Sequence, residues 1–141
     1  MMEQSNLVER WSRWEPIEGL DPKYYLDGII DSIDELRIRL ISDRDQSLGV
    51  DLTFDSAWCY RVSYESFRAD LTYQLGVKYG IDFGTKWTFF KVEESDYLSW
   101  FSRESYEFSN SAEMAHYCLM GAESFVDIAA STDPVVSLIK L

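Results

Sequence analysis

Hydrophobic and polar residues alternate with a period of two in several short stretches of the chain, as they do in strands that bury one face. In residues 35–40, three aliphatic side chains fall on one face and two arginines on the other. Because short polar turns separate these stretches, they predict an antiparallel meander of three or four strands. The last run is either a separate strand or a continuation of the third strand after a bulge at 55–56. The predicted strands are 24–31, 35–40, 50–55 and 57–62.

The pattern changes to a helical period between residues 64 and 79. Gly80 stands where a glycine commonly ends a helix. Gly76 lies inside the predicted helix, where glycine costs about 1 kcal/mol relative to alanine, so we expect the helix to pack closely against a sheet there. The stripe that this helix is expected to turn inward comprises Tyr64, Phe67, Leu71, Leu75 and Lys78.

Residues 87–92 carry large apolar side chains on both faces, which indicates a strand near the centre of a sheet. An acidic turn at 93–96 follows this strand. Ser95 or Asp96 can cap the helix that the pattern predicts at 96–106. One broad apolar band on this helix contains Tyr97, Leu98, Trp100 and Phe101.

The remaining segments complete the predicted fold. Residues 114–120 and 125–130 are expected to form strands, and the tail at 135–141 is expected to pair at a sheet edge. All elements together predict one α+β domain that spans residues 1–141. It contains an antiparallel, twisted sheet of about five or six strands, with two or three helices packed mainly on one face.

Residues 1–15 are polar and mixed, and we expect a loosely attached segment, partly a helical turn, with Trp11 and Trp14 as anchors. This start lacks the basic and apolar regions of a signal peptide, and no apolar run reaches the roughly 20 residues of a membrane span. Without secretion, Cys59 and Cys118 are expected to be reduced thiols. The sequence therefore predicts a cytoplasmic protein without membrane association.

The formal net charge is −12, from 25 acidic and 13 basic residues, and a hydrophobic fraction of 46% excludes disorder over most of the chain. A field of this sign repels nucleic-acid phosphates and anionic lipids, so neither is an expected partner. It attracts basic proteins and accelerates their association. The alternative is that the acidity only keeps an aromatic-rich protein in solution.

Signals for catalysis and metal binding are weak in this sequence. His116 is the single histidine, and together with Cys118 it supplies only two of the four ligands of a structural zinc site. Cys59 lies between Trp58 and Tyr60, an environment typical of an inert thiol. There is no nucleophile-elbow motif and no phosphate-binding loop. Pairs of carboxylates are abundant, but an acidic chain contains such pairs by chance. We therefore expect that the protein is not an enzyme and that it binds no metal and no cofactor.

Acidic residues gather in the predicted turns, close to more aromatic residues than one small core requires. Aromatic side chains supply buried area to a protein interface, and acidic ones attract a basic partner. The aromatic residues concerned are Trp58, Tyr60, Trp100 and Tyr106. Taken singly, each of these rings is more simply explained as part of the core. The acidic residues predicted to contact a basic partner are Asp31, Asp34, Glu35, Asp43, Asp45, Asp51 and Asp55, with Glu93, Glu94 and Asp96 as a second group.

A series of aromatic and polar residues follows a recognisable order between about residues 14 and 134. The series comprises Tyr60-Arg61-Val62 before a helix, Trp87–Val92, Tyr97–Ser102 with Glu104-Ser105, His116-Tyr117 and Val126-Asp127-Ile128. This order resembles small acidic bacterial immunity proteins of contact-dependent growth inhibition and other polymorphic toxin systems. The resemblance implies a cytoplasmic protein that binds and blocks a toxin domain, often a nuclease with a basic surface. It transfers no contact residues, because immunity interfaces are typically variable.

The sequence thus predicts an immunity protein that neutralises a basic, nuclease-type toxin domain in a one-to-one complex. Two alternatives remain open. The first is an acidic adaptor or regulatory module for another basic protein. The second is a small enzyme that uses a carboxylate pair, which a carboxyl with a raised pKa in a deep pocket would indicate.

Overall fold

A computed structural model describes residues 4–106 and 113–141 of the chain. Within these residues, strands dominate and every strand pair is antiparallel, which confirms the predicted α+β class. The elements are β1 (Arg10–Arg13), β2 (Tyr24–Asp31), β3 (Leu36–Ser42), β4 (Leu48–Phe54), β5 (Ala57–Tyr64), the 3₁₀ helix η1 (Glu65–Arg68), α1 (Ala69–Tyr79), β6 (Phe89–Glu93), α2 (Asp96–Glu104), β7 (Ala115–Met120), β8 (Ser124–Ala130) and β9 (Val135–Lys140).

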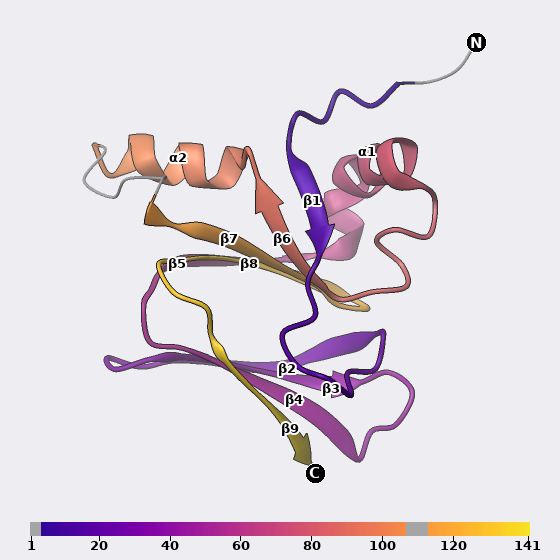
Figure 1. Cartoon of the computed structure of the whole chain (residues 1–141), viewed down its shortest axis with the longest axis vertical. Helices are drawn as coiled ribbons and strands as arrows, with labels where there is room; N and C mark the ends of the chain where they lie inside the picture. Colours follow the sequence, from indigo (N-terminus) through magenta and orange to yellow (C-terminus); the bar gives the residue numbers. More distant parts are fainter. Residues whose placement is uncertain (1–3, 107–112) are drawn as a thin grey trace.

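The strands form two sheets, whereas the sequence predicted a single sheet of five or six strands. The five-stranded sheet has the order β1-β6-β7-β8-β5, and the four-stranded sheet has the order β2-β3-β4-β9 (Figure 1). Strands β2 to β4 form the predicted meander. At Asp55-Ser56, however, the chain leaves this meander, and β5 pairs with β8 in the other sheet. Alternation along the chain identifies strands, but it does not determine which distant strand each one pairs with.

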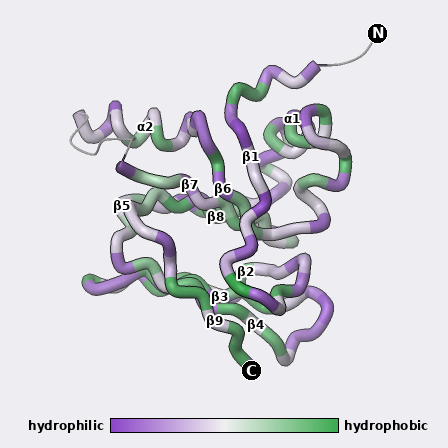
Figure 2. The backbone as a smooth tube through the Cα atoms, in the orientation of Figure 1, coloured by the Kyte–Doolittle hydropathy of each residue, from purple (hydrophilic) through white to green (hydrophobic). Residues whose placement is uncertain are grey.

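The two sheets lie face to face and share the largest core cluster. Ile38, Leu52 and Phe54 from the four-stranded sheet pack in it with Phe89 and Tyr117 from the five-stranded sheet. The rings of Phe54 and Tyr117 meet edge to face, with 5.3 Å between their centroids. The tube view shows that hydrophobic stretches run along the packed strands and that the loop joining β3 to β4 is hydrophilic (Figure 2).

Both α-helices cover the face of the five-stranded sheet that points away from the four-stranded sheet (Figure 1). Leu75 of α1 is buried among Phe90 and Cys118. Leu98 of α2 is buried in a separate small cluster with Ala129. The prediction that the helices pack on one face of a sheet is therefore confirmed, although that sheet is one of two.

Helix α1 begins later than predicted, because residues 65–68 form the 3₁₀ helix η1. Tyr64 and Phe67 are 65% and 80% exposed, so their predicted place in the buried stripe was wrong. The predicted end of the helix is confirmed, since Gly80 has a φ of 111° and donates its N–H to the Gly76 carbonyl. The prediction of close packing at Gly76 was wrong, because the nearest atom to an added Cβ lies 3.9 Å away.

Helix α2 begins as the sequence predicted. The Ser95 hydroxyl oxygen accepts the backbone N–H of Leu98 at 3.0 Å and thereby satisfies one of the free donors of the first turn. Tyr97 and Leu98 are buried, but Trp100 is 44% exposed. The buried band of this helix is therefore narrower than predicted.

The two chain ends extend the sheets. Residues 10–13 pair with β6 as a strand, whereas the sequence predicted a loosely attached segment with a helical turn. Trp11 is buried and Trp14 packs on Tyr117, so both serve as the expected anchors. The tail pairs with β4 as β9, as predicted.

None of the described helices is long and apolar enough to cross a membrane.

The two glycines of the four-stranded sheet differ in the space around them, and this difference gives a test of the fold. A Cβ at Gly49 would lie 2.8 Å from the Leu40 carbonyl oxygen, whereas a Cβ at Gly28 would meet nothing within 4 Å. We expect Gly49→Ala to lower the free energy of unfolding by about 1–3 kcal/mol, because backbone must move. Gly28→Ala is the matched control and should change it by less than about 1 kcal/mol. Urea unfolding of both variants measures the difference, and equal stabilities would contradict the sheet packing.

Candidate functional site

Four of the predicted acidic residues meet at one groove, which we call the acidic groove. Asp31 ends β2, and Asp34 and Glu35 follow it in the turn to β3. Asp55 comes from the crossing between the sheets. The turn is fixed by hydrogen bonds from the Ser32 backbone N–H and hydroxyl to the Glu35 carbonyl. The groove has a volume of about 330 Å³ and is open to solvent between this turn and the start of β5.

Most of the carboxylates in the acidic groove keep their charge uncompensated. Glu35 forms an ion pair with Arg37 at 3.0 Å. Asp31, Asp34 and Asp55 are exposed, and within residues 4–106 and 113–141 no basic side chain reaches any of the three within 4 Å. Their negative charge is therefore available to a partner.

Apolar side chains stand exposed beside these carboxylates. Trp58 lines the groove and is 42% exposed, and Ile33 at the tip of the turn is fully exposed. Tyr60 also lines the groove but is half-buried and packs against the main core. Trp58 thus confirms the predicted surplus of aromatic residues, as do the exposed Trp100 and Tyr106 elsewhere.

The other members of the first predicted acidic group lie elsewhere. Asp43 and Asp45 occupy the turn after β3, at the opposite end of that strand and roughly 20 Å from the acidic groove. Asp45 accepts hydrogen bonds from the backbone and hydroxyl of Ser47, and these bonds lower the pKa of its carboxyl. Asp51 lies in the middle of β4 and forms two hydrogen bonds with Arg39, at 2.8 and 2.9 Å. These three carboxylates therefore do not contribute to the groove.

The second predicted acidic group lies at the start of α2. Glu93 pairs with Arg10 at 2.7 Å, and Glu94 lies 3.9 Å from the same guanidinium. Asp96 is exposed in the first turn of the helix, where its charge meets the positive end of the helix dipole. Glu93 and Glu94 line a second groove of about 470 Å³, together with Ser95 and other residues.

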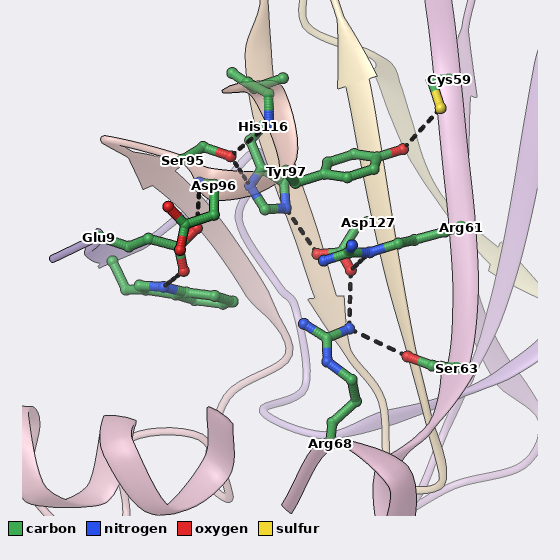
Figure 3. Close-up of polar contacts among 12 residues, drawn as sticks. Glu9, Cys59, Arg61, Ser63, Arg68, Ser95, Asp96, Tyr97, His116 and Asp127 are labelled. Carbon is green, nitrogen blue, oxygen red and sulfur yellow. Dashed lines mark hydrogen bonds and ion pairs between the residues drawn. The ribbon is translucent and has the colours of Figure 1, made fainter. Parts of the chain in front are cut away.

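A chain of polar residues leads inward from Ser95 and His116, which line this second groove, to the buried Asp127 (Figure 3). The Ser95 hydroxyl lies 2.7 Å from Nδ1 of His116, and Nε2 of His116 lies 2.7 Å from a carboxylate oxygen of Asp127. The other carboxylate oxygen of Asp127 accepts hydrogen bonds from Arg61 at 2.8 Å and from Arg68 at 3.0 Å. The chain therefore joins α2, β7, β8, β5 and η1.

The Asp127 side chain is fully buried and nevertheless ionised. Burial by itself raises the pKa of this carboxyl, but the hydrogen bond from His116 and the charges of His116, Arg61 and Arg68 together hold the pKa well below its ordinary value. A general acid requires the opposite shift. Asp127 is thus the negatively charged centre of an ion-pair cluster at neutral pH.

The residue types resemble a Ser-His-Asp triad, but the geometry does not. In such a triad the serine donates to Nε2 of the histidine and the carboxylate accepts from Nδ1, and here the two ring nitrogens are exchanged. The Ser95 oxygen also accepts the Leu98 N–H, and Ser95 is only 6% exposed. The chain therefore acts as a structural connection. One signal in the sequence could have identified it, since Asp127 is the only charged residue in the apolar run 125–130.

The two cysteines are free thiols, as predicted. Cys118 is fully buried in the cluster beneath α1, and burial raises the pKa of its thiol well above the ordinary value. Cys59 is half-buried and accepts a hydrogen bond from the Tyr97 hydroxyl at 3.1 Å. A buried thiol with a raised pKa is a poor nucleophile.

No protein-family model, no curated protein and no solved structure matches this chain. In the part of the chain that the structure describes, no group of three histidine, cysteine or acidic residues is placed to hold a metal ion. The acidic groove brings carboxylates without a described basic partner beside an exposed tryptophan ring, and this chemistry suits a basic ligand.

The ion-pair cluster predicts a large effect on stability. We expect Asp127→Asn to lower the free energy of unfolding by about 3 kcal/mol or more at pH 7, because the buried carboxylate loses its interactions with the buried His116 and with Arg61 and Arg68 together. Asp51→Asn is the matched control. It breaks a partly exposed pair with Arg39 and should cost less than about 1 kcal/mol. Urea unfolding of both variants measures the two losses, and similar losses would contradict the central role of Asp127.

The same carboxylate makes stability depend on pH. Its pKa is lower in the folded protein than the ordinary value of 3.8 in the unfolded chain, so its contribution is complete above about pH 5 and is lost as the pH falls through the folded pKa. The stability difference between the wild type and Asp127→Asn should therefore be constant from pH 5 to 7 and shrink below about pH 4. Urea unfolding at several pH values provides this measurement, and a difference that grows in acid would refute the assignment.

Proposed function

We propose that this protein binds a basic protein through the acidic groove and neutralises it in a one-to-one complex, as an immunity protein neutralises a toxin domain. One observation carries the proposal: three carboxylates gather beside the exposed ring of Trp58, and no basic side chain of the described residues pairs with them. These carboxylates belong to Asp31, Asp34 and Asp55. Carboxylates of this kind gain ion pairs only when a partner supplies lysine or arginine. The toxin class of that partner rests on the resemblance to immunity proteins.

Charge and apolar area have separate roles in this proposal. The net charge of −12 attracts a basic partner over a distance and raises the association rate. Trp58 and Ile33 then supply side chains that can be buried at short range, where large apolar groups contribute most of the affinity. A nuclease-type toxin would be blocked because the complex covers the basic surface with which it binds nucleic acid. An immunity protein of this kind would act in the cytoplasm, where a delivered toxin meets its substrate.

The adaptor alternative uses the same groove and differs only in the partner. A regulatory module would bind a basic protein that is not a toxin, so the identity of the captured protein separates the two functions. The enzyme alternative has less support. The pKa of the buried Asp127 is lowered, and the Ser95–His116–Asp127 chain has the reverse of a catalytic orientation.

Capture from a lysate of the source cells, at low and then at moderate salt, identifies the partner. We expect one basic protein at one-to-one stoichiometry, retained less well as salt rises. Asp31→Lys/Asp34→Lys should reduce its association rate about tenfold at low salt and flatten the salt dependence. Stopped-flow or biosensor kinetics with the captured protein measures the rate.

A matched variant separates the groove from the overall charge. Asp43→Lys/Glu18→Lys makes the same change in net charge at two exposed positions away from the acidic groove. It should leave the association rate within about threefold of the wild type. Equal slowing by both double variants would reject the acidic groove as the contact surface. Inhibition of the toxic activity by the wild type would favour the immunity function over the adaptor function.

A further inference from the structure

Strand β5 is an eight-residue strand at the edge of the five-stranded sheet. It pairs with β8 on one side, and none of the described strands pairs with its other side. Its first residues, Ala57 to Tyr60, line the acidic groove. An unpaired strand edge carries free backbone N–H and C=O groups, which are a template for another strand.

The hydrogen-bond pattern shows which residues of β5 carry these free groups. The Glu65 N–H donates to the Glu123 carbonyl across the pair with β8. Because the direction of these groups alternates along an antiparallel strand, the backbone groups of Arg61 and Ser63 also point toward β8. Those of Tyr60 and Val62 point to the open edge, as does the Tyr64 N–H, and no other described residue bonds them. The Tyr64 carbonyl is not free, because Tyr64 caps η1 and its carbonyl accepts the first hydrogen bond of that helix.

The other sheet edges are less suited to a partner strand. β1 has four residues, and its Trp11 N–H donates to the hydroxyl of Tyr79. β2 contains a register shift between Leu26 and Gly28, and its Tyr24 backbone bonds Thr88 and Ala122. β9 has an open edge of six residues, but it does not border the acidic groove.

The open edge of β5 also presents apolar side chains. Trp58, Val62 and Tyr64 are 42%, 46% and 65% exposed, although a soluble protein usually protects a long edge strand with charged residues or proline. The one basic side chain in β5, Arg61, pairs with Asp127 and stacks over the Tyr97 ring, with 4.4 Å to the ring centroid. The edge therefore combines free backbone groups and apolar side chains with the unpaired carboxylates at its start.

We propose that a basic, extended segment of the partner pairs with the open edge of β5 and adds a sixth strand to the five-stranded sheet. This inference rests on the proposed function, since it specifies how the basic partner is held. Backbone hydrogen bonds to Tyr60, Val62 and Tyr64 supply the pairing. Lysine or arginine side chains of the added strand reach the carboxylates of the acidic groove, and Trp58 packs against its apolar side chains.

A synthetic peptide tests the pairing without the natural partner. The probe is a blocked heptapeptide, Lys-Val-Lys-Thr-Lys-Val-Lys, and its control is the same peptide with every backbone nitrogen methylated. The control has the same charge and side chains, but it has no backbone N–H groups with which to pair. NMR titration of the wild type measures affinity, and hydrogen exchange measures protection of individual amides. We expect the first peptide to bind at least about fivefold more tightly and to slow exchange at Tyr60, Val62 and Tyr64.

Two variants of Val62 separate the backbone from the side chain. Val62→Pro removes an N–H that points to the open edge, and such a position tolerates proline. Val62→Ala keeps the N–H and removes only side-chain atoms. We expect Val62→Pro to bind the first peptide about fivefold more weakly than Val62→Ala does. The protection pattern is measured on the wild type, so the proposal can fail even if the proline variant does not fold.

The outcomes separate this inference from the proposed function. If both peptides bind equally and Asp31→Lys/Asp34→Lys weakens both, the strand pairing is overturned while the acidic groove remains a site for basic partners. Protection on β9 instead of β5 also overturns the pairing. If neither peptide binds at millimolar concentration, the pairing is overturned and the groove itself loses support.

Discussion

The buried charge of Asp127 is the interaction on which the arrangement of the elements depends. A carboxylate removed from water costs several kcal/mol unless opposite charges and hydrogen bonds compensate it. Arg61 and Arg68 supply the charges, and His116 supplies a hydrogen bond and passes the connection to Ser95 at the start of α2. Five elements must therefore be in place together before the charge is satisfied. The cluster thereby ties η1 and the start of α2 to the five-stranded sheet.

The same cluster decides which charges face the solvent. Arg61 lies on the edge strand β5, but its charge is offset by Asp127. Three carboxylates beside the start of that strand have no basic side chain of the described residues within 4 Å. They belong to Asp31, Asp34 and Asp55. The protein thus compensates its buried charges internally and leaves uncompensated acids beside an exposed tryptophan. A surface built this way leaves negative charge available to a ligand, whereas the buried Ser95–His116–Asp127 chain has the reverse of a catalytic triad's orientation.

Several local features could be predicted because they depend on neighbours in the chain. Alternation at 35–40 identified β3, and the position of Ser95 before an apolar band identified the cap of α2. The errors arose where a tertiary contact overrides the local pattern. Residues 10–13 became a strand because β6 has a free edge for them, although their own sequence is polar and mixed.

The sequence by itself determined the α+β class, most strands, both helices and the acidic character of the surface, because each follows from spacing or from composition. Only the tertiary structure decided that the strands divide into two sheets. It also decided which acidic residues lie together: the acids at 43–45 lie at the far end of β3, whereas one groove contains Asp31, Asp34, Glu35 and Asp55. It alone joined Ser95, His116 and Asp127, which are up to 32 residues apart in the chain. The physical reason is that strand pairing and ion pairing act between residues that are close in space, and the period of a sequence reports only which face each residue occupies.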